Sequence, residues 1–200
     1  MGVMTTGPST ARGQQRRQQI IGAAAEILRE SGPASVSMRN VAKRGAASLS
    51  AMTYYFENAD ELLEEAGRVN IGLWANRAEK VAEQAESGPK PEGREAAIDL
   101  VLAATLPKDS PLLGHYSQLI AAGSSAPVAR AYHTGRGRLN LAVGRVLNVV
   151  NIDAPAELVI AIVDGAAVTA LSEGCDVHET ARRYLCELLA HYDDETWPCR

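Results

Sequence analysis

The chain has 200 residues, 46% of them hydrophobic, which suffices for one sizeable domain or two small ones around a buried core. Residues 1–56 carry seven basic and two acidic side chains, a formal charge of +5, whereas residues 57–200 carry a formal charge of −9. A basic head on an acidic body is typical of a DNA-reading module joined to a part that must not bind DNA, and the absence of any apolar run of ~18 residues or of a signal peptide excludes a membrane-spanning protein.

The first predicted element is a helix over residues 14–29. Ahead of it, the start of residues 1–13 is rich in Gly, Ser, Thr and Pro, so we expect a flexible basic arm there. Within the helix, apolar side chains recur at helical spacing at Ile20, Ala24, Ile27 and Leu28. A Ser-Gly-Pro sequence at 31–33 supplies a glycine stop with proline behind it, which predicts the end of the helix.

Residues 37–56 predict two short helices around a tight turn. Ser37 can cap the first helix and Gly45 can end it. Ser48 can cap the second helix, which carries Met52 and Phe56 at i, i+4 spacing for packing against the core. This is a helix-turn-helix pattern, whose second helix usually enters a DNA major groove.

A fourth, longer helix is predicted from residue 58 to about 84, with Asn58 as its cap and Glu61 completing a capping box. No later segment alternates as a strand, and we place the remaining helices at about 92–105, 111–123, 127–149, 155–173 and 177–192. The predicted fold is therefore all-α. It consists of a helix-turn-helix DNA-binding domain at 14–57 and a helical ligand-binding and dimerisation domain at 58–200.

The most apolar part of the body, residues 157–174, is hydrophobic nearly all round and rich in Ala and Gly. Such a helix packs closely on more than one side, so we expect a subunit interface as well as a domain core there. Asp164 lies inside this stretch, and a buried carboxylate requires partners. We expect it to cap a neighbouring helix or to pair across a dimer, with ligand contact as the alternative. In the preceding helix we expect solvated side chains for Arg136, Arg138 and Arg145.

Over residues 16–66 the sequence resembles a TetR-type (tetracycline-repressor-like) transcriptional regulator. The resemblance lies in QQIIGAAAEILRESG, then VAKR, GAAS, TYYF and ADEL at the family's spacing. It implies an all-helical fold with a three-helix DNA-binding head and a variable ligand-binding body. It also implies a homodimer, in which the last two helices, here 155–173 and 177–192, form a four-helix bundle with the partner subunit.

Carried over position by position, the resemblance implies that one face of the helix-turn-helix lies at or near DNA, through Arg39, Ser48, Leu49, Ser50, Ala51, Tyr54 and Tyr55. Arg39 can reach a phosphate or a guanine edge, with a solvated helix arginine as the alternative. The hydroxyl of Ser48 suits a phosphate oxygen and can equally serve only as a helix cap. Leu49 and Ala51 cannot donate hydrogen bonds, so we expect them to contact thymine methyl groups or to read DNA shape.

For Tyr54 we expect a phosphate contact, whereas Tyr55 can face either DNA or the core. The chain departs from the family's pattern at several positions, among them Ala47 in place of Val, Thr53 in place of Tyr and Tyr55 in place of His, and at two more that affect this surface. Gly45-Ala46 stands where the family has Ala-Gly, and Ala59 stands where the family commonly has a lysine that touches a phosphate. The missing contact is expected to be offset by the basic residues Arg12, Arg16 and Arg17.

A ligand pocket needs a mostly apolar cavity in which a few polar or aromatic groups converge. The residues of this kind on the apolar helices of the body are Trp74, His115, Tyr116, Gln118, Tyr132 and Asn140. For each of them an ordinary core or surface residue is the alternative. No motif identifies the ligand.

These features predict a cytoplasmic, ligand-responsive repressor that binds a pseudo-palindromic double-stranded DNA operator as a homodimer and is released by a small-molecule inducer. An enzyme is not expected, because no Gly-rich phosphate loop, GxSxG, HExxH or paired-carboxylate motif occurs. The three cysteines and four histidines lack metal-ligand spacing, so we expect reduced thiols, no structural metal and no cofactor. The alternative is an all-helical protein-interaction adaptor without specific DNA binding, against which the +5 head argues.

Overall fold

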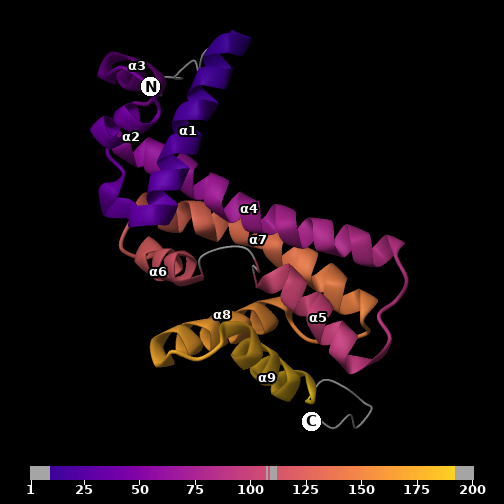
Figure 1. Cartoon of the computed structure of the whole chain (residues 1–200). Coiled ribbons are helices and arrows are strands. Elements are labelled where there is room, and N and C mark those ends of the chain that lie inside the picture. The colour runs from indigo at the N-terminus through magenta and orange to yellow at the C-terminus, as the bar shows by residue number, and fades with distance from the viewer. Residues whose placement is uncertain (1–9, 107, 109–111, 192–200) are drawn as a thin grey trace. The chain divides into compact units, whose positions relative to one another are not determined.

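Helices make up all the regular secondary structure in the part of the chain that the structure describes. This computed structural model describes residues 10–106, 108 and 112–191, without the side chains of 112–115. The elements in chain order are α1 (Ala11–Ser31), the 3-10 turn η1 (Pro33–Ser35), α2 (Met38–Arg44), α3 (Leu49–Tyr55), α4 (Ala59–Ser87), α5 (Gly93–Thr105), α6 (Leu112–Ala122), α7 (Ala126–Val149), α8 (Ala156–Glu173) and α9 (Val177–Leu189) (Figure 1). The all-α prediction is confirmed. Among these helices, none is long and apolar enough to cross a lipid bilayer.

The first helix is longer than predicted. α1 begins at Ala11 rather than at Gln14, because the Thr10 hydroxyl accepts a hydrogen bond from the Gly13 amide at 3.2 Å and caps the helix. The expected flexible arm is therefore helical from residue 11 onward, while residues 1–9 lie outside the described part of the chain. At the other end Gly32 adopts a φ of 77°, as the predicted glycine stop requires. The body helices lie within three residues of their predicted ends.

The chain divides into two compact units. The first, here called unit 1, contains the described residues of Met1–Ile71 and Ser117–Thr134. Its core is one apolar cluster whose deepest side chains include Ile20, Val41, Met52, Phe56 and Leu62. Ala122 and Val128 belong to the same cluster. The core of the predicted three-helix head is therefore completed by the start of α4 and by a segment about 60 residues further along the chain.

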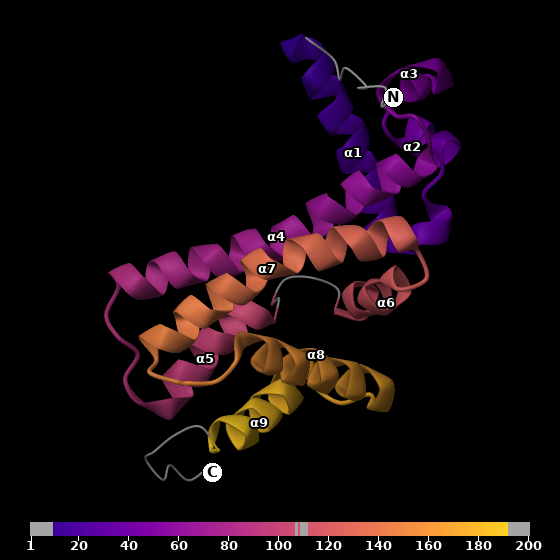
Figure 2. The same ribbon diagram turned by 180° about the vertical axis from the view of Figure 1, so that it is seen from behind.

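Within unit 1, the first part of α4 and the start of α7 approach each other closely at Gly67 (Figure 2). A Cβ atom on Gly67 would lie 2.9 Å from the Cβ of Ala131 and 3.5 Å from the Cα of Val128. Real side chains do not tolerate such a contact, so the packing of these two helices depends on the absence of a side chain at this position.

The second unit, unit 2, contains the described residues of Gly72–Tyr116 and Gly135–Arg200. In it α9 packs against α8 and α5 (Figure 1). The side of α8 toward its neighbours is fully buried and consists of Val159, Ile160, Val163, Ala166, Ala167 and Ala170. Another side of the same helix leaves Ala161 and Gly165 exposed, so α8 is apolar on its outer side as well.

Three arginines of α7 that were expected to be solvated are ion-paired. Arg138 binds Glu79 at 2.6 Å and Arg145 binds Glu86 at 2.5 Å, both across to α4. Arg136 lies 3.6 Å from Asp164 of α8. Arg138 is exposed, as expected, and Arg136 and Arg145 are partly exposed. The ion pairs were not anticipated, because the sequence pattern of α7 alone does not show the glutamates of α4 or the aspartate of α8.

The cysteines also differ from the expectation of reduced thiols. Cys186 is disulfide-bonded, whereas Cys175 is an exposed free thiol. Cys199 lies outside the described residues.

Candidate nucleic-acid interface

The two helices of the predicted helix-turn-helix are both present and both capped as expected. The Ser37 hydroxyl accepts a hydrogen bond from the Asn40 amide at 3.2 Å and begins α2. The Ser48 hydroxyl accepts one from the Ala51 amide at 3.1 Å and begins α3. Met52 and Phe56 are buried, so the predicted core-facing side of the second helix is confirmed.

The turn between α2 and α3 places its unusual backbone conformation at Ala46. Ala46 has a φ of 47°, in the left-handed region, whereas Gly45 has an ordinary φ of −79°. The alanine therefore occupies the position that favours glycine, and the glycine occupies the position that does not need it. The turn is closed by a hydrogen bond from the Ala47 amide to the Ala42 carbonyl at 2.9 Å.

The outer face of α3 carries most of the residues expected at DNA. Leu49 and Tyr54 are 52% and 73% exposed, which is unusual for large apolar or aromatic side chains, and Ser50 is exposed beside them. Tyr55 instead packs against the apolar cluster of unit 1, with its ring edge-on to that of Tyr54 at 5.0 Å between centroids. Ala51 is half-buried. Of the two options left open for Tyr55, the structure places it mainly against the core.

A cleft of about 600 Å³ lies between the first turns of α1 and the end of α3. Its lining comprises Thr10, Arg12, Gly13, Gln15, Arg16, Gln19, Tyr54 and Tyr55. Sequence reasoning missed the two glutamines, because in this segment it weighed only the arginines as DNA contacts. The helical spacing of Arg12, Gln15, Arg16 and Gln19 was the available signal, since these positions share one face of a helix.

The basic residues of unit 1 differ in whether other side chains hold them. Arg17, Arg29 and Arg44 are held by other side chains: Arg44 by Glu30 at 2.7 Å, Arg29 by the Asn70 amide oxygen at 2.6 Å, and Arg17 by two glutamates. In contrast, Arg12, Arg39 and Lys43 are exposed and make no ion pair with any described residue. The charge that is free to meet a polyanion is therefore concentrated on α2 and at the start of α1.

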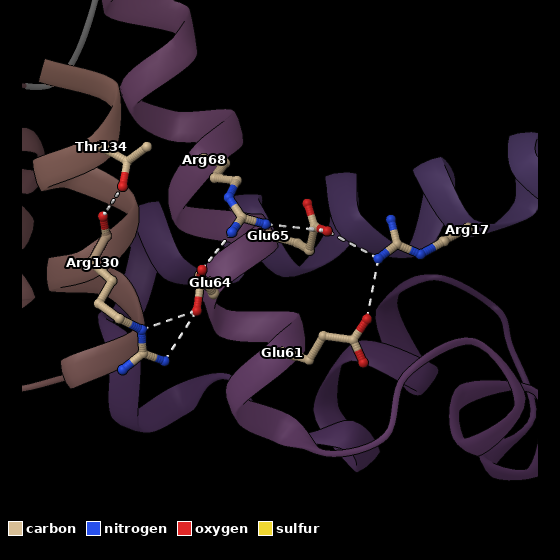
Figure 3. Close-up of polar contacts among 7 residues, drawn as sticks. All are labelled: Arg17, Glu61, Glu64, Glu65, Arg68, Arg130 and Thr134. Carbon is tan, nitrogen blue, oxygen red and sulfur yellow. Dashed lines mark hydrogen bonds and ion pairs between the residues drawn. The ribbon is translucent and has the colours of Figure 1, made fainter. Parts of the chain in front are cut away.

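The Arg17 contacts belong to a chain of ion pairs that crosses three helices of unit 1 (Figure 3). The Arg17 guanidinium lies 3.2 Å from Glu61 and 3.0 Å from Glu65 of α4. Arg68 pairs with Glu65 and Glu64, and Glu64 in turn binds Arg130 of α7 at 3.0 Å. Alternating charges of this kind fix the helices relative to one another more firmly than isolated surface pairs do.

Of the expected ligand-binding residues, Tyr116 is the most buried. Its hydroxyl lies 3.4 Å from Asp164, and burial together with that carboxylate raises the pKa of the phenol. Burial also raises the pKa of Asp164 to about 6, against the opposing influence of Arg136 and the Tyr116 hydroxyl. The partners of Asp164 are thus Tyr116 of α6 and Arg136 of α7 within the same unit. Neither partner is a helix end, contrary to one expectation, because α6 and α7 both bring polar side chains to this part of α8. Pairing across a dimer stays a prediction.

The other expected ligand-binding residues do not gather around Tyr116. Tyr132 and Gln118 belong to unit 1, where Tyr132 lies beside Asn70 and Arg29 and burial raises the pKa of its phenol. Asn140 donates to Glu157 at 2.9 Å, and Trp74 is half-buried. The side chain of His115 lies outside the described residues.

A cavity of about 820 Å³ lies in unit 2 against α5 and α9, and its lining includes Arg94, Ile98, Cys175, Thr180, Arg182 and Cys186. None of the residues expected to bind a ligand lines it. Most residues expected at DNA thus gather in unit 1, whereas the residues expected at a ligand do not line this cavity of unit 2.

Known proteins resemble this chain most closely at the helix-turn-helix. Residues 20–66 match the bacterial regulatory proteins of the tetR family. The HTH-type nicotine-responsive transcriptional repressor HdnoR of Paenarthrobacter nicotinovorans is 45% identical over 51 residues, which is 26% of this chain and 26% of the relative. The match thus spans about a quarter of that relative's length.

Solved structures resemble the chain over most of its length. The multidrug binding protein EbrR, in complex with imidazole, is 25% identical, with a TM-score of 0.61 over 86% of this chain and 94% of that chain. A TetR transcription regulator from Haloarcula marismortui is 22% identical, with a TM-score of 0.68 over 90% of this chain and 98% of that one. The latter likeness shows a shared fold.

Proposed function

The chain belongs to the tetR family of bacterial regulatory proteins, and from this premise we propose that it is a cytoplasmic DNA-binding repressor. It acts as a homodimer on a pseudo-palindromic operator and is released by a small-molecule inducer. The observation that carries the proposal is the outer face of α3, where Leu49 and Tyr54 are exposed. Arg12, which lines the same cleft as Tyr54, and Arg39 of α2 make no ion pair with a described residue. In this division of labour residues 14–57 bind DNA, while 58–200 bind the ligand and form the dimer.

On DNA, α3 enters the major groove. Leu49 and Ala51 contact thymine methyl groups, and Ser50 and Tyr54 donate hydrogen bonds to phosphate oxygens. Arg12, Arg39 and Lys43 supply the salt-dependent attraction to the backbone. Because few base-reading donors lie on α3, sequence preference comes largely from apolar contact and from DNA shape.

The dimer forms through residues 155–173 and 177–192, which contain α8 and α9. The exposed Ala161 and Gly165 of α8 support this, because small residues let a second helix approach closely. A two-fold axis between subunits presents two α3 helices to half-sites about one helical turn or somewhat more apart.

An inducer binds unit 2 and lowers operator affinity, which requires that it bind the DNA-free conformation better than the DNA-bound one. Support comes from the relatives: HdnoR is a nicotine-responsive repressor, and EbrR has been solved with imidazole and with proflavin. Trp74, Tyr116 and Asn140 remain the residues of unit 2 that we propose to contact the inducer.

The proposal is tested by fluorescence anisotropy with random duplex DNA at about 50 and about 200 mM salt, followed by selection of bound sequences from a random pool. Strong loss of affinity at the higher salt and recovery of a two-fold-symmetric sequence are expected. An adaptor or an enzyme shows little salt-sensitive binding and enriches no sequence.

On the selected duplex, Arg39→Ala and Tyr54→Phe should each lower affinity by about tenfold, the value of one charge-assisted or phosphate hydrogen bond. Both variants should keep the wild-type circular dichroism spectrum and melting temperature, since both side chains are exposed. Unchanged affinity in both variants contradicts the placement of the interface on α3.

A further inference from the structure

We propose that Arg16 and Arg17 are positioning residues that hold α3 at its two ends, instead of the phosphate contacts that their charge suggests. The inference rests on the proposed function, because it assigns the source of the orientation in which α3 meets DNA. It follows from the separate contacts that these two neighbouring side chains make.

Arg16 holds the chain immediately before α3. Its guanidinium donates a hydrogen bond to the Ala46 carbonyl at 2.7 Å and another to the Gln19 side chain at 3.0 Å. Ala46 is the turn residue with a φ of 47°, a conformation that an alanine adopts only when its surroundings hold it there. Arg16 is the side chain from α1 that does so.

Arg17 holds the chain immediately after α3. Its guanidinium lies over the ring of Phe56, 5.0 Å from the centroid, and the same group pairs with Glu61 and Glu65 (Figure 3). Phe56 ends α3, and Glu61 accepts a hydrogen bond from the Glu57 amide at 2.8 Å in the link to α4. One arginine thus fastens the end of α3 and the start of α4 to α1.

Consecutive residues of a helix point about 100° apart, so two adjacent arginines on α1 reach in different directions. Here these directions lead to the two ends of a seven-residue helix that begins at Leu49. The third arginine of the segment, Arg12, faces the cleft beside Tyr54 and makes no ion pair among the described residues. The three arginines therefore divide into one that is free to meet DNA and two that are engaged within the protein.

A phosphate contact and a positioning contact differ in their dependence on salt. A side chain that neutralises a phosphate contributes about 0.9 to the slope of log K against log salt concentration. A residue that orients α3 contributes nothing to the slope, but its loss lowers the preference for the correct sequence. The ratio of affinities for a selected duplex and a random duplex reports that preference directly.

The experiment measures this slope and this ratio for the full chain and for Arg12→Gln, Arg16→Gln and Arg17→Gln. We expect Arg12→Gln to lower the slope by about 0.9 per head and to leave the ratio unchanged. Arg16→Gln and Arg17→Gln should keep the slope and reduce the ratio about tenfold, as expected for one lost base contact. If they flatten the slope as Arg12→Gln does, the positioning role is wrong while the proposed function stands. If the wild-type chain shows no slope, the proposed function itself fails.

A second pair of variants leaves both arginines in place. For these variants a phosphate contact and a positioning contact predict changes in DNA affinity of opposite sign. If Arg17 bound a phosphate, Glu65→Gln would release it and raise DNA affinity. The matched control is Glu57→Gln, which removes the same charge from an exposed residue whose side chain makes no ion pair with described residues. Positioning predicts that Glu65→Gln binds the selected duplex more weakly than Glu57→Gln, whereas equal or tighter binding overturns it.

Loss of folding is separated from loss of positioning by amide hydrogen exchange. In the Arg16→Gln variant we expect faster exchange at the amides of residues 49–56 and unchanged protection in α5 and α8. Adding Ala46→Gly to Arg16→Gln should restore part of the ratio of affinities for the selected and the random duplex. Glycine adopts the positive φ of this turn without strain, so it does not need the Arg16 contact. Failure of glycine to restore any of it contradicts the role assigned to the Arg16 contact.

Discussion

Units 1 and 2 differ in how the residues singled out in the sequence are arranged in space. In unit 1 the residues expected at DNA lie on the two short helices α2 and α3 and at the start of α1, and most of them are exposed. In unit 2 the residues expected at a ligand contact separate partners: Tyr116 contacts Asp164, and the Asn140 amide nitrogen contacts Glu157. Spacing within a short motif therefore determines where side chains meet, but spacing across separate helices does not.

The largest effect that we predict tests the core beneath the outer face of α3. Phe56→Ala should destabilise the chain by about 3–5 kcal/mol, because Phe56 is 2% exposed and its loss leaves a cavity. Leu49→Ala on the same helix should change stability by less than about 0.5 kcal/mol, since Leu49 is 52% exposed. Urea unfolding followed by circular dichroism measures both. Similar losses in the two variants would falsify the assignment of inner and outer faces to α3.

Unit 2 should respond to pH through Asp164. The pKa of this carboxyl is raised by burial to about 6 in the folded chain, against 3.8 for an unperturbed aspartate. The folded chain therefore holds this proton more tightly than the unfolded chain, so protonation of Asp164 stabilises the fold. This contribution to the free energy of unfolding is lost as pH rises between about 4 and 6. At pH 7 the ionised group costs on the order of 3 kcal/mol.

Asp164→Asn should remove this dependence. The asparagine cannot ionise, so the stability of the variant relative to the wild type with a protonated Asp164 does not vary over this pH range. The free energy of unfolding of the variant minus that of the wild type should therefore increase from pH 4 to pH 7. Parallel pH profiles, measured by urea titration, contradict the raised pKa of Asp164.

A smaller effect tests how α4 and α7 pack within unit 1. Gly67→Ala should destabilise by about 1–3 kcal/mol, because the new Cβ meets Ala131 at 2.9 Å. Gly72→Ala in the same helix is the control: nothing lies within 4 Å of its Cβ, so it should stabilise by about 1 kcal/mol through helix propensity. If both substitutions stabilise, α4 and α7 do not pack closely at this point.

What could be predicted from the sequence was local. The caps at Ser37 and Ser48, the glycine stop at 32 and the buried pair Met52 and Phe56 each depend on residues within one turn or two. A helix cap is a contact between residues that are close in the sequence, so a short stretch of sequence contains everything needed to predict it.

Contacts between distant residues were not predictable in the same way. Glu64 and Arg130 are 66 positions apart, and no pattern within α4 or α7 specifies that these two side chains meet. The same holds for Ala122 and Val128, whose place in the core of unit 1 depends on tertiary packing of small residues. The register between two packed helices depends on how their side chains fit over the whole contact. The periodicity of apolar residues along one helix does not carry this information.

The smallest effect compares one turn residue from each unit. The non-glycine residues with positive φ in the described chain are Ala46 in unit 1, at 47°, and Asn151 in unit 2, at 56°. Asparagine tolerates this conformation, whereas alanine is strained by about 1–2 kcal/mol. Replacing the alanine with glycine relieves this strain, but the higher conformational entropy of the unfolded glycine variant offsets part of the gain. Ala46→Gly should therefore raise the free energy of unfolding by about 0.5–1 kcal/mol, and Asn151→Gly should leave it nearly unchanged. If Asn151→Gly raises the free energy of unfolding as much as Ala46→Gly does, the turn before α3 is not strained. Arg16 then has no strained conformation to stabilise.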